Sequence, residues 1–168
     1  MLIGTTMKVL GFIALSILVL AAALVLIGQL GYLRGQAPID LGVREGRLKP
    51  PSDTPNSVSS QAELYPTHPQ RAYASIAPLA FKGTGEQAVT SLAHILKNTD
   101  RCILVTQQPG SLYAQCSTAL LHFTDDVEFW LDTSVGVVQV RSASRLGRGD
   151  LGANRARVEK IRAQFIMN

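Results

Sequence analysis

The stretch from residue 141 to residue 157 reads RSASRLGRGDLGANRAR and holds five arginines, three glycines and one aspartate. Guanidinium groups pair with carboxylates and phosphates, and glycine lets backbone N–H groups approach a ligand closely. A helix predicted to begin near Gly152 would add the positive potential of its free N–H groups. The stretch therefore predicts an anion-binding corner. Its candidate ligand-binding residues are Ser142, Ser144, Arg145, Arg148, Asp150, Asn154 and Arg155.

The same arginines also allow a purely structural interpretation. Apolar and polar residues alternate over residues 127–132, which is the period of a half-buried strand. Side chains two residues apart share a face, so Asp126 and Glu128 would point to one face and Asp125 to the other. A hairpin would then bring Glu128 opposite Arg141. In this interpretation Asp126, Glu128 and Arg141 form a structural ion network, because a buried arginine requires an acidic partner.

Catalytic and cofactor chemistry has little support in the sequence. The three histidines lack the spacing of metal ligands, so no metal site is expected. Residues 83–88 match the pattern G-x-G-x-x-A, but a dinucleotide site also needs parallel β-α-β units, for which the remaining chain is too short. Thr84 and Gln87 instead predict a capping box at the start of a helix. We assign no cofactor and no catalytic residue.

The N-terminal part of the chain predicts a membrane anchor. Residues 9–33 contain no charged side chain, and a helix needs roughly 20 apolar residues to cross a bilayer. A cleaved signal peptide has a shorter apolar core followed by a small-residue cleavage site, so we favour an uncleaved transmembrane helix. The predicted organisation is an N-terminal tail, the anchor, a linker and a globular domain, at residues 1–8, 9–33, 34–47 and 48–168.

Two cysteines bear on which side of the membrane the domain occupies. With Pro109 as the pivot of a predicted hairpin, Val105 faces Tyr113 and Cys102 faces Cys116. A disulfide and two buried thiols both fit that pairing, and a disulfide would require an oxidising compartment. The basic residues that follow the anchor favour the opposite, cytoplasmic placement. We predict an extracytoplasmic domain on a single-pass protein of the bacterial inner membrane.

The domain itself is predicted to be α+β. Residues 48–70 have the composition of an extended arm rich in proline and serine, and residues 71–168 that of a compact core. The core pattern predicts a first strand over residues 74–81, a helix after Thr84, two hairpins and a terminal helix from near Gly152. These elements would form an antiparallel sheet of about four to five strands with two helices on one face.

Three segments of the chain resemble a bacterial and plant family catalogued as domain of unknown function 1499. They are LKPPSDTPNSVSSQA at residues 48–62, DDVEF at residues 125–129 and RSASRLGRGDLGANR at residues 141–155. The resemblance implies that the last segment acts as one unit, and it implies no activity and no catalytic residue. Relatives commonly carry two cysteines where Pro51 and Ser57 stand here, which implies that Cys102–Cys116 is a replacement disulfide.

The predicted function is a non-enzymatic, membrane-tethered binding or accessory module of the cell envelope. Its partner would be an anionic small molecule, a lipid head group or an envelope protein. The net charge of +4 is concentrated near the C-terminus, but nucleic acid is not expected because no aromatic stacking platform accompanies it. Two alternatives stay open: a hydrolase that uses Asp126 or Glu128 with Arg145, and a purely structural accessory subunit.

Overall fold

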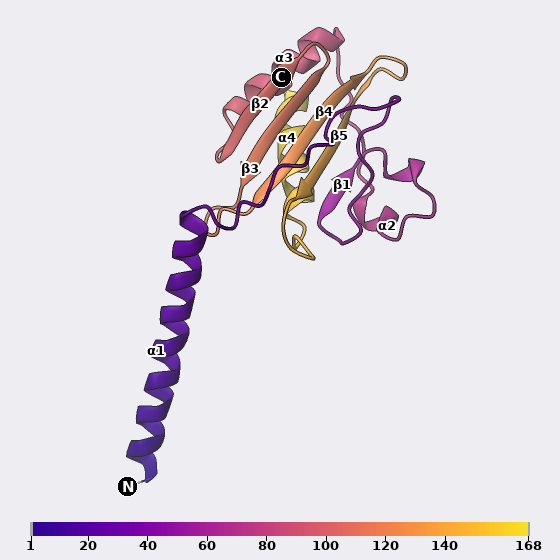
Figure 1. The fold of residues 1–168 in the computed structure, drawn as a ribbon. Helices are drawn as coiled ribbons and strands as arrows, with labels where there is room; N and C mark the ends of the chain where they lie inside the picture. Colours follow the sequence, from indigo (N-terminus) through magenta and orange to yellow (C-terminus); the bar gives the residue numbers. More distant parts are fainter. Residues whose placement is uncertain (1, 168) are drawn as a thin grey trace.

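The computed structural model describes residues 2–167 and shows an α+β domain preceded by one long helix (Figure 1). The helical elements are α1 (Leu2–Gln29), the 3-10 turn η1 (Ala62–Leu64), α2 (Arg71–Ala74), α3 (Gly85–Lys97) and α4 (Ala153–Met167). The strands are β1 (Ser57–Ser59), β2 (Cys102–Gln108), β3 (Ser111–Ser117), β4 (Thr124–Asp132) and β5 (Val137–Ser144).

The five strands form one antiparallel sheet in the order β1-β5-β4-β3-β2, with α3 and α4 on the same face (Figure 1). Alternate residues of the central strands, such as Phe129 and Val140, point towards these helices. They are buried together with Leu92 of α3 and Ile161 of α4. Removing this apolar surface from water is the main force that holds the helices on the sheet. The predicted fold class, an antiparallel sheet with two helices on one face, is confirmed.

The predicted first strand, residues 74–81, is wrong. After α2 this segment makes only isolated bridges, Ser75 with Ser59 and Leu79 with Val138. In its place the sheet contains β1, which lies in the predicted extended arm and pairs with the edge of β5. All three residues of β1 are buried, so the strand shows no alternation that a sequence pattern could reveal.

The β2–β3 hairpin pairs Cys102 with Cys116, and a disulfide joins the two residues. Closer to the turn the pairing differs from the prediction, because Tyr113 faces Thr106 and not Val105. The turn holds two residues instead of pivoting on one, and a bulge at Val105 takes up the residue left over.

Helix α3 begins at the predicted capping box. The Thr84 hydroxyl accepts a hydrogen bond from the Gln87 N–H at 3.2 Å, and the Gln87 side chain accepts one from the Thr84 N–H at 3.0 Å. These two bonds satisfy N–H groups that the first turn of a helix leaves free. Helix α4 begins at Ala153, one residue after the predicted start.

Helix α1 is long and apolar enough to cross a membrane. Its segment Thr6–Gln29 has a mean hydropathy of 3.0, and the apolar stretch of this segment is not buried against the rest of the protein. Its 28 residues span about 42 Å, compared with roughly 30 Å for the hydrocarbon core of a bilayer. The helix ends before the predicted limit at residue 33 because Gly31 adopts a left-handed conformation, with φ of 88°.

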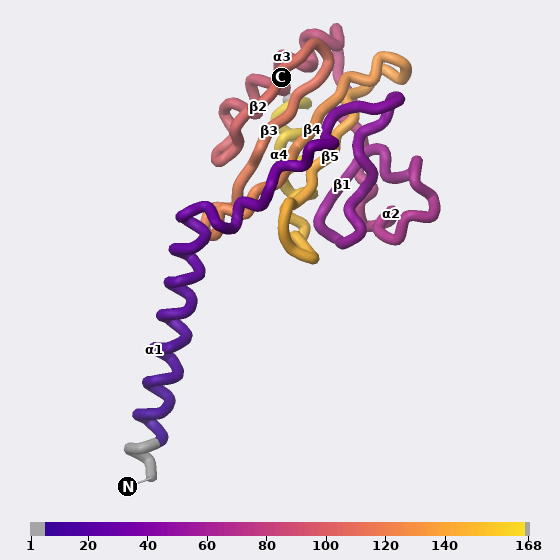
Figure 2. Tube along the Cα trace, viewed as in Figure 1, coloured from indigo at the N-terminus to yellow at the C-terminus, as the bar shows by residue number. Residues whose placement is uncertain are grey.

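The chain from residue 34 to residue 56, which we name the crossing segment, runs over the second face of the sheet. Figure 2 shows it passing in front of β3, β4 and β5, with α4 behind them. The Gly42 N–H donates to Glu128 Oε1 at 2.6 Å, and Arg141 Nε donates to the Pro50 carbonyl at 3.3 Å. The crossing segment therefore covers the polar face of the sheet over β4 and β5.

Candidate functional site

Strands β4 and β5 carry charged side chains on both faces of the sheet. The predicted alternation is confirmed: Asp126 and Glu128 point under the crossing segment, and Asp125 points towards α4. Glu128 lies opposite Arg141 in the register of the two strands, also as predicted. The acids and arginines are thus divided between two separate clusters.

The first cluster is centred on Asn154, which is fully buried in the first turn of α4. Its Nδ2 lies within hydrogen-bond distance of the Asn56 carbonyl, Ser144 Oγ and Asp150 Oδ2, at 3.0, 2.9 and 2.8 Å. Its Oδ1 accepts a hydrogen bond from Ser142 Oγ at 2.5 Å. We name this cluster the α4 polar network; its members are Asn56, Ser142, Ser144, Asp150, Asn154 and Arg157.

Asp150 occupies the N-terminus of α4, where the sequence predicts an anion. Its carboxylate accepts hydrogen bonds from the N–H groups of Gly152 at 3.0 Å and Asn154 at 2.9 Å, and from the Tyr73 hydroxyl at 2.5 Å. Burial by itself raises the pKa of Asp150, but the hydrogen bonds from Tyr73, Asn154 and Gly152 together lower it. The protein's own carboxylate therefore uses the donors that an external anion would need.

The seven residues predicted to bind a ligand lie in separate places. Four of them belong to the α4 polar network. Arg155 is turned away from the others and donates to the carbonyls of Tyr73 and Ser75 at 2.5 and 2.9 Å. Arg145 lies on the opposite face of the sheet. Arg148 is exposed, and within residues 2–167 it has no hydrogen-bond or ion-pair partner.

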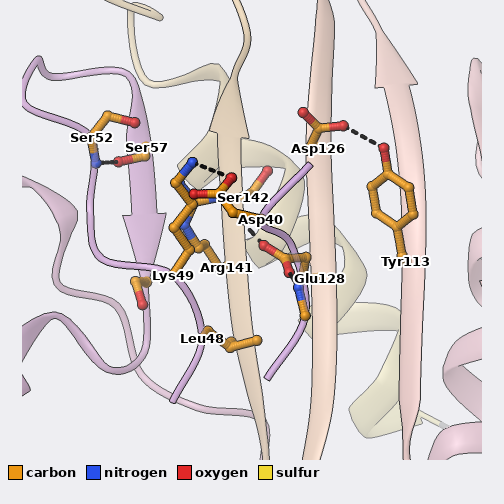
Figure 3. Close-up of polar contacts among 12 residues, drawn as sticks. Asp40, Leu48, Lys49, Ser52, Ser57, Tyr113, Asp126, Glu128, Arg141 and Ser142 are labelled. Atoms are coloured by element: carbon orange, nitrogen blue, oxygen red, sulfur yellow. Dashed lines mark hydrogen bonds and ion pairs between the residues drawn. The ribbon is translucent and has the colours of Figure 1, made fainter. Parts of the chain in front are cut away.

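The second cluster lies beneath the crossing segment and begins with Arg145 and Asp126. Arg145 Nε and Nη2 approach the two Asp126 carboxylate oxygens at 3.0 and 2.7 Å. The Tyr113 hydroxyl donates to the same carboxylate at 2.6 Å, and Figure 3 shows these two side chains facing each other from neighbouring strands. Both charged side chains are buried, so this bidentate pair is well formed.

Arg141 and Glu128 form a looser pair beside the first. Arg141 Nη1 lies 3.4 Å from Glu128 Oε2, and both side chains are only 4% exposed. Burial raises the pKa of Glu128 and lowers that of Arg141, because the loss of hydration outweighs their mutual attraction. This buried guanidinium therefore has weaker protein partners than its neighbour Arg145.

A cavity of about 320 Å³ lies between part of the crossing segment and the side chains of Asp126, Arg141 and Arg145, and we name it the crossing cavity. Its lining includes Lys49, Ser52, Asp126, Arg141, Ser144 and Arg145. Among the residues that the structure describes, Arg141 Nη2 and Arg145 Nη1 donate to no protein atom. Lys49 Nζ contributes a third cation and is held by Asp40 at 2.7 Å (Figure 3).

Sequence reasoning did not identify the crossing segment's contribution to this cavity. Lys49 and Ser52 stand in the first of the three segments that resemble the family, and this was an available signal. Asp40 and Gly42 have no motif around them. Their contacts depend on the path of the crossing segment over the sheet, which no local pattern records.

The basic residues near the C-terminus do not form one cationic surface. Arg157 donates to Asp125 at 2.5 Å, and Arg162 donates to Glu159 at 2.9 Å and to two backbone carbonyls. Across residues 2–167, no group of three or more His, Cys, Asp or Glu side chains is placed to hold a metal ion. The crossing cavity is lined by guanidinium, ammonium and hydroxyl groups together with the carboxylates of Asp53 and Asp126.

The raised pKa of Glu128 predicts an unusual dependence of stability on pH. An exposed glutamate has a pKa of about 4.3, so the unfolded chain releases this proton at lower pH than the folded chain does. Between the two pKa values the folded state binds more protons, and its stability falls as the pH rises. In urea titrations, the free energy of unfolding of the wild type relative to Glu128→Gln should therefore decrease from acid to neutral pH.

Asp150 provides the control of opposite sign, because its folded-state pKa is lowered. The stability of the wild type relative to Asp150→Asn should be present above a pH of about 3.9 and should be lost as the pH falls further. If the Glu128→Gln comparison followed the same direction as the Asp150→Asn comparison, attraction to Arg141 and not burial would control Glu128.

The protein is of the class in which an α+β domain follows one helix that is long and apolar enough to cross a membrane. A family model described as "Protein of unknown function (DUF1499)" matches residues 47–165, which is 119 of the 168 residues. The chain belongs to this family, and the resemblance drawn from its motifs is confirmed. No curated protein matches the chain.

Proposed function

We propose that this protein is a membrane-anchored, non-enzymatic module that binds a small anion in the crossing cavity. The ligand group would be a carboxylate or a phosphate. The observation that carries the proposal is that two buried guanidinium groups line one cavity and each leaves a terminal nitrogen without a protein partner. The proposed site keeps Arg145 from the sequence prediction and adds Arg141, Lys49 and Ser52, whereas the Ser144 hydroxyl belongs to the α4 polar network.

The hydrogen bonds of Arg141 support this proposal. Its side chain is almost fully buried, yet its two bonds to the protein are long, at 3.3 and 3.4 Å. Among the described residues Arg141 Nη2 has no protein partner and is not among the fully buried polar atoms that lack one, so it is free to donate to a ligand oxygen. Arg145 Nη1 and Lys49 Nζ would complete a set of charge-assisted donors of the kind that selects carboxylates and phosphates.

Binding accounts for the charged side chains better than hydrolysis does. Asp126 accepts hydrogen bonds from Arg145 and from Tyr113, and Glu128 accepts from Gly42 and Arg141. A general acid or base must be able to exchange a proton with its substrate, and these carboxylates are already occupied by donors. The proposal therefore gives both acids a supporting role: they hold the guanidinium groups in place.

The binding test compares conservative substitutions at arginines inside and outside the cavity. The full-length protein in mild detergent is titrated with citrate, inorganic phosphate and glycerol phosphate while thermal unfolding is followed. A ligand at a hundred times its Kd should raise the free energy of unfolding by about 2.7 kcal/mol. The stabilisation should be lost in Arg141→Lys and Arg145→Lys, because lysine keeps the charge but removes the free guanidinium nitrogen.

Arg148→Lys is the matched control, since Arg148 is exposed and lies outside the cavity. Lys49→Gln is a further cavity variant whose partly exposed position makes misfolding a lesser concern. Equal stabilisation of Arg145→Lys and Arg148→Lys would indicate a general salt effect and would contradict the proposal, as would the absence of stabilisation by every probe.

The membrane anchor and its orientation form the second part of the proposal. Helix α1 supports a single span, and the Cys102–Cys116 disulfide supports a domain in an oxidising compartment, outside the cytoplasm of a bacterial inner membrane. In cells quenched with acid, neither cysteine should react with a maleimide polymer before reduction, and both should react after it. Val135→Cys, at an exposed position, should be labelled on intact spheroplasts by a membrane-impermeant maleimide. Free native thiols together with a protected residue 135 would place the domain in the cytoplasm.

A further inference from the structure

We propose that two loops of the domain dock onto the lipid surface beside α1 and hold the domain in one orientation on the membrane. They are the β3–β4 loop, residues 118–123, and the β5–α4 loop, residues 145–152; we name them the membrane-proximal loops. The inference rests on the proposed membrane span of α1. Its occupant is the head-group region of the bilayer.

The end of α1 is packed directly against the first of these loops. Gln29 Nε2 donates to the Leu120 carbonyl at 3.0 Å. Gly28 lies so close to the loop that a Cβ atom there would be 2.6 Å from the Leu121 carbonyl oxygen. Because α1 would leave the bilayer at this point, the contact places residues 118–123 at the membrane boundary.

The second loop is brought to the same place by the start of the crossing segment. A Cβ atom on Gly35 would lie 2.8 Å from Arg145 Cβ and 3.0 Å from Leu146 Cγ. Figure 1 shows both loops at the end of the sheet from which α1 departs, and the β5–α4 loop projects in the direction in which α1 runs. The β4–β5 turn lies at the opposite end.

The membrane-proximal loops expose leucines that have no role in the core. Leu120, Leu146 and Leu151 are 61%, 40% and 106% exposed. Leu151 also has a φ of 51°, a conformation that is unusual for a leucine. Tyr32, 76% exposed just after α1, is the residue type that favours the membrane–water interface. Exposed apolar side chains gathered on two loops at one end of a domain are typical of a surface that contacts a membrane.

The charges of the loops complement an anionic lipid surface. Arg148 stands between Leu146 and Leu151, is exposed and has no partner among the described residues. The only acidic residue in the two loops is Asp150, whose carboxylate is turned inward to Tyr73 and the first turn of α4. Basic and apolar side chains side by side are typical of segments that lie in the head-group layer.

The test uses single-cysteine variants of the full-length protein in nanodiscs of phosphatidylcholine and phosphatidylglycerol. The two native cysteines are joined in the disulfide, so an introduced cysteine can be labelled alone with an environment-sensitive fluorophore. Leu151→Cys reports on the β5–α4 loop, Val135→Cys on the far β4–β5 turn and Leu18→Cys on the middle of α1. Lipids with nitroxide quenchers at shallow or deep positions measure the depth of each label.

The label at residue 151 should be quenched by shallow nitroxides, since docked side chains sit about 5–10 Å into the head-group boundary. The label at residue 135 should not be quenched, and the label at residue 18 should be quenched by deep nitroxides. Adding Arg148→Glu should reduce quenching at residue 151 and leave residue 18 unchanged.

The three positions separate the failure of this inference from the failure of the anchor. If residue 18 is quenched and residue 151 responds no more than residue 135, α1 spans the membrane but the loops do not dock. If residue 18 is not quenched, the anchor and the docking both fail. Anion binding in the crossing cavity involves none of the three labelled positions and is tested separately by the ligand titration.

Discussion

Replacing Asn154 with alanine should lower the free energy of unfolding by about 4 kcal/mol. Its amide is fully buried and connects Ser142, Ser144, Asp150 and the Asn56 carbonyl. Alanine removes every one of these bonds, and each buried polar group left without a partner costs about 1–3 kcal/mol. Urea denaturation of the full-length protein in detergent, followed by the fluorescence of the single tryptophan, measures the loss.

Two further variants separate hydrogen bonding from packing at this position. Asn154→Asp keeps the shape of the side chain but cannot donate, and it sets a second carboxylate beside Asp150, so it should be about as destabilising as alanine. Arg148→Ala, in the same motif but exposed, should change stability by no more than about 0.5 kcal/mol. A loss below about 1 kcal/mol for Asn154→Ala would show that the α4 polar network does not hold the helix on the sheet.

Replacing Arg157 with alanine should destabilise the protein by about 3–5 kcal/mol, because it leaves a buried charge without its partner. Arg157 Nη2 donates to Asp125 at 2.5 Å, and the Asp125 side chain is only 2% exposed. Within residues 2–167, Asp125 has no other side-chain partner. The change would show as a lower urea midpoint with an unchanged slope.

The double variant Asp125→Ala with Arg157→Ala tests this cause. Removing both charges should cost less than removing Arg157 alone, since no carboxylate is then left unpaired in the interior. Lys160→Ala controls for changes to α4 itself, because Lys160 is exposed on the same helix and should have an effect within about 0.5 kcal/mol. Additive losses from the two single variants would mean that the ion pair does not couple Asp125 to Arg157.

Much of the fold could be predicted from patterns among residues that are close together in the sequence. Thr84 and Gln87 predict the start of α3 because the capping box needs only residues that are neighbours in the chain. The placement of Glu128 opposite Arg141 follows from a short hairpin, where the turn fixes the register. In the other hairpin, a single bulge at Val105 was enough to move Tyr113 to a different partner.

Contacts between distant segments were beyond such patterns. Strand β1 is three residues long and buried throughout, so it is defined only by the edge of β5 that it meets. The motif that contains Arg145, Arg148 and Arg155 appears in sequence as one basic corner. In the structure Arg145, at the end of the sheet, pairs with Asp126, whereas Arg155, on α4, donates to backbone carbonyls elsewhere.

The sequence by itself determined the apolar helix at the N-terminus, the antiparallel hairpins, the capped helix and the membership of the family. Each of these depends on composition, on a periodic pattern or on residues close together in the chain. Only the tertiary structure decided that Lys49 meets Arg141 and Arg145 in a cavity under the crossing segment. Residues nearly a hundred positions apart must meet there, and which of them meet is set by how the whole chain excludes water and pairs its buried charges.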